Sequence, residues 1–203
     1  MEVYSYIVLS NSITPFGMNH NRTLFHDSFL RALDDLKDFG AFGVMFAGGH
    51  SLFEMISLIS LFAAQQDSLS SPSDELDPER LRTYKRLKTS ALNWNPPATE
   101  SLDFASLSER RAALEIRRPA LLIFLETALS CFTKHDMTRM HQLQPLIDVA
   151  ISYLPQAMVS SYSCLLMWPL MIIGSCSVKE EQRSILKDTL IHNRYMMRHT
   201  IQA

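Results

Sequence analysis

The residues of this chain best suited to catalysis are its histidines and acids, because such side chains make the commonest metal sites of enzymes. The sequence holds seven histidines, and no two stand four residues apart, the spacing that brings two ligands to one helix face. His50 and Glu54 have that spacing but would complete only half of a site. Nothing points to further ligands, so we predict no bound metal and no metal-dependent active site.

A serine nucleophile and a phosphate-binding loop are also poorly supported. The segment Gly48-Gly49-His50-Ser51 resembles a hydrolase turn in composition, but a nucleophile turn requires G-x-S-x-G between a strand and a helix. Here two apolar residues follow the serine, so we interpret Ser51 as the N-cap of a helix. Neither glycine-rich phosphate motif occurs. The sequence therefore predicts no catalytic residue and no cofactor.

The cysteines and the overall charge exclude further classes of protein. The three cysteines lie in apolar surroundings without a C-x-x-C pair, which indicates free core thiols: Cys131, Cys164 and Cys176. The net charge of -2 argues against a general nucleic-acid binder. A membrane span needs roughly 20 apolar residues. The apolar run 164–173 is shorter and contains Pro169, so we predict that it is buried protein.

Two basic clusters could meet phosphates, but both are better interpreted as solvated helix faces. The first cluster comprises Arg80, Arg82, Lys85, Arg86 and Lys88. Its helix begins with acids, which leaves the cations toward the end that the helix dipole favours. The second cluster comprises Arg110, Arg111, Arg117 and Arg118, and two acids dilute it.

An apolar effector cleft is the one candidate binding site. Pro169 beside Trp168 removes a backbone donor, and the freed carbonyl could open a small cleft in a helical bundle. The candidate lining is apolar and adaptable: Tyr162, Cys164, Met167, Trp168, Pro169 and Met171. Simple core packing of the tryptophan is the preferred alternative.

Helical periodicity extends through nearly the whole chain, and strand patterns are missing. We therefore predict an all-α fold, a single domain of about eight helices over residues 1–203. The expected helices are residues 2–13, 24–38, 51–66, 77–95, 106–134, 136–154, 155–174 and 178–195. Residues 67–76 are rich in serine and acids and indicate an internal loop.

Several helix boundaries carry specific signals. Asp77-Pro78-Glu79 indicates a helix start, with the proline at the first helical position. Ser106 and Ser177 each open a pattern typical of a capping box. Pro119 should kink or split its helix, and Pro155 should lie in the first turn of the next one.

Seven segments also form a pattern by their order along the chain: residues 2–6, 13–18, 42–46, 52–61, 92–97, 120–125 and 168–183. Among them are a short Trp-Pro segment at residues 94–97 and a later Trp-Pro-Leu, Gly and Arg series at Trp168, Gly174 and Arg183. In this order the segments resemble the fungal-specific transcription factor domain. Each segment is weakly specific, and their shared order is what makes the resemblance useful.

The resemblance implies an all-helical regulatory domain that usually follows a DNA-binding zinc cluster built on six cysteines. This sequence has three cysteines and starts abruptly with an apolar helix, so we expect a regulator without its own DNA-binding module, incomplete at its N-terminus. It would act in the nucleus through other transcription regulators or a full-length relative. Control of a metabolic or secondary-metabolite gene cluster is a further implication of the resemblance.

Two alternatives stay open at this point. The chain could be a helical protein-interaction scaffold with no role in transcription. It could also be a small-molecule-binding helical protein, with an effector in the cleft beside Trp168.

Overall fold

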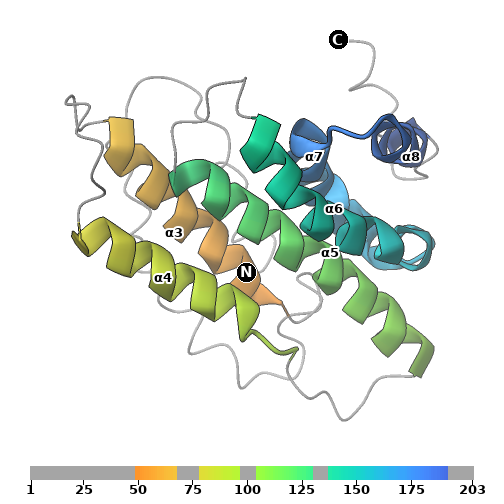
Figure 1. Cartoon of the computed structure of the whole chain (residues 1–203). Helices are drawn as coiled ribbons and strands as arrows, with labels where there is room; N and C mark the ends of the chain where they lie inside the picture. Colours follow the sequence, from red (N-terminus) through yellow and green to blue (C-terminus); the bar gives the residue numbers. More distant parts are fainter. Residues whose placement is uncertain (1–48, 68–77, 97–103, 130–136, 192–203) are drawn as a thin grey trace. The chain divides into compact units, whose positions relative to one another are not determined.

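The computed structural model describes residues 49–67, 78–96, 104–129 and 137–191, and every regular element in these ranges is a helix (Figure 1). The elements are α3 (His50–Asp67), α4 (Pro78–Leu92), α5 (Phe104–Leu129), α6 (Met137–Met158), the 3-10 helix η2 (Ser161–Leu166), α7 (Met167–Cys176) and α8 (Glu180–Ile191). The all-α prediction is confirmed for this part of the chain. The predicted helices 2–13 and 24–38 and most of the predicted loop 67–76 lie outside the described residues.

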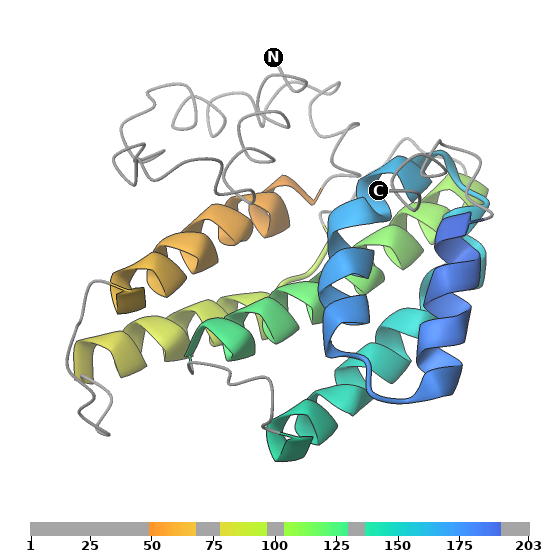
Figure 2. The same ribbon diagram turned by 90° about the horizontal axis from the view of Figure 1, so that it is seen from above.

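The chain forms two compact units, Met1–Leu87 and Lys88–Ala203. In the first unit, α3 and the first part of α4 lie side by side and run in opposite directions (Figures 1 and 2). Most of α3 is buried, as its narrow polar stripe predicts. Its buried apolar residues are Leu52, Phe53, Met55, Ile56, Ile59 and Phe62. The Arg80 guanidinium lies over the Phe62 ring, 4.5 Å from its centroid, and ties α4 to α3.

The start of α3 corrects the prediction that Ser51 is its N-cap. The carbonyl of Gly49 accepts hydrogen bonds from the amides of Leu52 and Phe53, so the first helical residue is His50. Gly49 therefore occupies the capping position, and Ser51 lies inside the first turn. The start of α4 is as predicted, because the helix begins at Pro78, where the missing N–H costs nothing.

The second unit is built on α5, which packs against α6, η2 and α7. Its core brings together apolar residues from α5, α6, η2, α7 and α8, including Ile116, Ile123, Ile147, Leu166, Leu170, Ile173 and Leu186. Of the predicted kink or split at Pro119, the split does not occur, because α5 continues through the proline. Ile116 and Ile123, on either side of the proline, are both fully buried in this core, and that packing holds the helix continuous.

The other prolines also stand inside a helix rather than between helices. We predicted that α6 ends near Leu154 and that Pro155 opens the next helix, but α6 continues through both Pro145 and Pro155 to Met158. Both prolines are exposed. Water can therefore satisfy the carbonyls that they leave without an amide partner, and the helix is not forced to end.

The two predicted capping boxes are both wrong. The structure starts α5 at Phe104, so Ser106 is already within its first turn. Ser177 ends α7 instead of opening α8: its hydroxyl donates to the carbonyl of Ile173 at 2.8 Å and its amide to that of Gly174 at 3.3 Å. Since a serine can cap either end of a helix, the sequence pattern alone could not decide between them.

Candidate functional site

The six predicted cleft residues lie on consecutive turns of η2 and α7, but they do not share one surface. Tyr162, Met167 and Trp168 are half-buried, and Pro169 is buried. Met171 is 62% exposed and faces away from the core. Cys164 belongs to η2, and its side chain is outside the described part. The cleft itself stays a prediction.

The proline in this segment explains why a 3-10 helix gives way to an α-helix here. Pro169 lies in the first turn of α7, so it removes no hydrogen bond from that helix. In a continuous α-helix the amide of residue 169 would donate to the carbonyl of Leu165, and proline has no such donor. The α-helix therefore starts afresh after Leu166, with η2 before it.

Arg117 of α5 takes over the carbonyl that the proline leaves. Its Nη2 donates to the Leu165 oxygen at 2.6 Å, and the whole arginine is only 2% exposed. The freed carbonyl therefore has a side-chain donor, which favours core packing, the preferred interpretation of this segment. A charged donor on a buried carbonyl is among the stronger hydrogen bonds of a protein.

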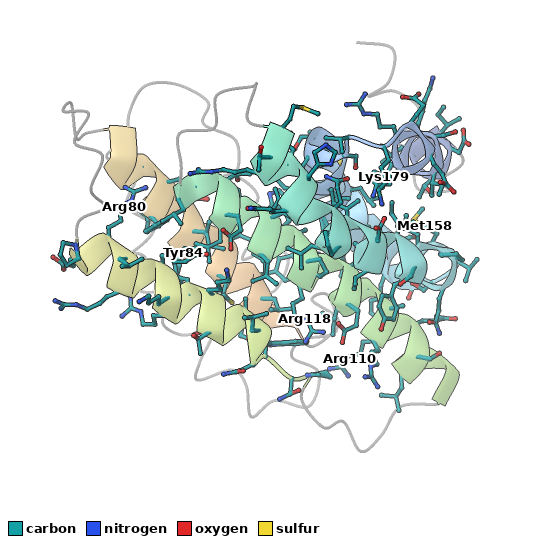
Figure 3. The ribbon with its side chains drawn as sticks, viewed as in Figure 1. Arg80, Tyr84, Arg110, Arg118, Met158 and Lys179 are labelled. Carbon is teal, nitrogen blue, oxygen red and sulfur yellow. The ribbon has the colours of Figure 1, made fainter. Side chains whose placement is uncertain are left out.

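The burial of Arg117 also corrects the prediction for the second basic cluster. Arg110 and Arg117 stand seven residues apart on one face of α5 and are both buried, whereas Arg111 is exposed. Arg118 is half-buried and pairs with the carboxylate of Glu115 one turn before it. Figure 3 shows Arg110 and Arg118 on the first half of α5. The adjacent charged residues, among them Glu109 and Arg118, give no sequence signal for this burial.

Trp168 packs in the second unit against Phe124 of α5. The two rings meet edge to face, with centroids 5.7 Å apart and an interplanar angle of 85°. The indole Nε1 is buried without a hydrogen-bond partner among the described residues. The packing supports the core-anchor interpretation of this tryptophan.

Gly174 is not required by close packing, and we expect Gly174→Ala to be neutral or stabilising. A Cβ built at this position would lie 4.0 Å from Cδ1 of Leu186, an ordinary van der Waals distance. Alanine is a better helix former than glycine by up to about 1 kcal/mol. Chemical denaturation should show an equal or higher free energy of unfolding. A loss of more than about 1 kcal/mol would show that α7 and α8 pack more tightly here than the structure has them.

A polar clasp joins α6 to the start of α8. The Asp148 carboxylate accepts hydrogen bonds from Lys179 at 2.9 Å and from the buried Gln182 at 2.7 Å. Next to it, the buried amide of Gln144 donates to the carbonyl of Cys176 at 3.1 Å. In α8 the buried residues are Gln182 and Leu186, and the clasp adds polar contacts to this small buried set. The Cys176 thiol is free and buried, as predicted, and burial raises its pKa.

The clasp predicts an acid-sensitive helix. Hydrogen bonds from Lys179 and then Gln182 lower the pKa of Asp148 below its ordinary value of 3.8. The stability that it contributes is therefore complete above that value and is lost as the pH falls through the lower pKa of the folded state. We expect Asp148→Asn to remove this acid step and to speed hydrogen exchange of the α8 amides at neutral pH. Unchanged protection in that variant, relative to the intrinsic exchange rate, would contradict the clasp.

The first basic cluster is divided by the fold. Arg80 and Lys88 turn inward: Arg80 lies on Phe62, and Lys88 pairs with Glu126 of α5 at 2.7 Å. Figure 3 shows Arg80 and Tyr84 on the side of α4 that faces α3. The other three cations are exposed, as the solvated-face interpretation predicts: Arg82, Lys85 and Arg86.

The described residues contain no group of three or more His, Cys, Asp or Glu side chains arranged to hold a metal ion. None of the helices described here is both long enough and apolar enough to cross a membrane.

Comparison with known proteins identifies the family. A family model for the fungal-specific transcription factor domain matches residues 3–200. No curated protein and no solved structure matches the chain. The family match covers nearly the whole sequence and confirms the resemblance. The chain therefore belongs to the fungal-specific transcription factor domain family, a family of transcription regulators and not of enzymes.

Proposed function

We propose that this chain regulates transcription in the nucleus through contacts with other proteins and not through its own contacts with DNA. The observation that carries the proposal is the family match over residues 3–200, since that family supplies the regulatory part of transcription factors. The partners would be other transcription regulators or a full-length relative, and the regulated genes a metabolic or secondary-metabolite cluster.

Two properties of the chain support a role without direct DNA contact. The sequence has three cysteines, and its net charge of -2 gives no general attraction to a polyanion. The buried arginines Arg110 and Arg117 serve the fold, so they do not add to a basic surface. We therefore propose that the chain presents helical surfaces to other proteins.

The test is a comparison of transcripts in a fungal host that expresses the full chain and in the same host expressing a variant with a disrupted core. Leu170→Asp is such a variant, because Leu170 is almost fully buried. We expect a restricted set of transcripts to change only with the intact chain, and the purified chain to show no sequence-specific binding to duplex DNA. Tight binding of specific duplexes by the chain alone would refute the proposal. Nuclear exclusion without any change in transcripts would favour the scaffold alternative.

A further inference from the structure

Helix α4 presents three cations that the fold does not use. Arg82, Lys85 and Arg86 are exposed, and within the described residues none of them has an ion pair or a hydrogen bond to another side chain. The same helix commits Arg80 to the Phe62 ring and Lys88 to the Glu126 carboxylate. The fold thus separates inward, partnered cations from outward, unpartnered ones, and we call the three outward residues the α4 basic face.

The spacing of the α4 basic face makes its three charged side chains neighbours on the helix surface. Residues three and four apart on a helix are surface neighbours, about 5–6 Å between Cβ atoms. Arg82 is therefore next to both Lys85 and Arg86, and long flexible stems let all three heads reach one anionic group. Two guanidinium forks and one ammonium suit a carboxylate pair or a phosphate.

The arrangement is unfavourable for the isolated helix. Like charges at these spacings destabilise a helix by a few tenths of a kcal/mol per pair, about 0.2–0.5. The acid of the first turn, Glu79, precedes all three cations, and no acid follows it within α4. An external anion would relieve this repulsion.

We propose that the α4 basic face binds an acidic segment of a partner protein, through carboxylates or a phosphoserine. The inference rests on the proposed function, in which the chain acts through protein contacts, and it names the chemistry of one such contact. A DNA duplex fits less well. The three cations span only about 6 Å of helix axis, and duplex binding usually neutralises several phosphates along the strands. A short flexible acidic peptide can reach this face while avoiding the acids of a chain with net charge -2.

The test uses the purified full chain and short fluorescein-labelled peptides that differ only in carrying serine, glutamate or phosphoserine at the same positions. Fluorescence anisotropy at low salt should show binding of the glutamate and phosphoserine peptides and none of the serine peptide. The R82E/K85E/R86E variant should bind them at least about tenfold more weakly, which is about 1.4 kcal/mol. The phosphoserine and glutamate arms distinguish which anion is preferred.

A matched control variant distinguishes the loss of the α4 basic face from the change in net charge that its substitution causes. R111E/R139E/K187E makes the same change in charge at three exposed cations on three different helices, and it should keep the affinity of the native chain. If the charge-reversed variants do not fold, the neutral R82Q/K85Q/R86Q variant replaces the first of them. Equal losses in face and control variants, no binding of either acidic peptide, or tighter binding of a labelled duplex would each overturn the inference. In the first two cases a persisting effect of the chain on transcripts would leave the proposed function standing, whereas tight binding of a specific duplex would refute the proposed function as well.

Discussion

Arg117→Met is expected to lower the free energy of unfolding of the second unit by about 3 kcal/mol. The methionine fills most of the space but cannot donate, so the buried Leu165 carbonyl loses its charged donor. A lost hydrogen bond that leaves a buried acceptor unsatisfied costs about 1–3 kcal/mol, and more where a charge is involved. Urea denaturation followed by tryptophan fluorescence measures this, because both tryptophans, Trp94 and Trp168, lie in the second unit.

Two further variants test whether the effect depends on the hydrogen bond from Arg117 to the Leu165 carbonyl. Arg111→Met removes an exposed arginine from the same helix and should change stability by no more than about 0.5 kcal/mol. Pro169→Ala restores an amide that can donate to Leu165. It should therefore be more favourable in the Arg117→Met background than in the native chain, with a coupling of about 1 kcal/mol. Additive effects of the two substitutions would show that the arginine and the proline do not share this carbonyl.

Leu170→Ala is expected to destabilise the second unit by about 3 kcal/mol, while Met171→Ala next to it should have almost no effect. Leu170 is 1% exposed in the core shared by α5, α6 and α7, so its truncation leaves a cavity. Large-to-small changes of this kind cost about 2–5 kcal/mol. Met171 is mostly in water, and the same type of change there should stay within about 0.5 kcal/mol.

The pair of variants tests the direction in which α7 faces, which its sequence does not reveal. The same denaturation experiment applies to both. A large loss of unfolding free energy for Met171→Ala would mean that this side chain is buried. It would then be a candidate lining residue of a closed cleft. Equal and small losses of unfolding free energy for Leu170→Ala and Met171→Ala would contradict the placement of α7 in the core.

Much of the fold follows from local signals in the sequence. The narrow polar stripe predicts the burial of α3, and Pro78 marks the start of α4, because burial pattern and backbone chemistry act within one helix. The cap at Ser177 is mispredicted because a serine hydroxyl can serve either end of a helix. Pro155 was mispredicted because its tolerance depends on whether its side of α6 faces water, which is a property of the packed structure.

The candidate site was less predictable, because its decisive contact joins residues 48 positions apart in the sequence. Charge patterning makes Arg117 look solvent-exposed, and only the packing of α5 against η2 reveals that it is buried. The partner is a backbone carbonyl, so no residue type signals it. The Trp-Pro pattern did indicate a freed carbonyl at the right place, but not what would occupy it.

A tethered reporter assay tests directly whether the chain regulates transcription through protein contacts. The full chain is fused to a heterologous DNA-binding module, and the reporter transcript is compared with that produced by the module alone and by the module carrying the Leu170→Asp variant. We expect the intact chain to change the transcript level, Leu170→Asp to abolish the change, and Met171→Ala to preserve it. A transcript level equal to that of the module alone, with the fusion folded and bound at its site, would contradict a role in regulating transcription through protein contacts.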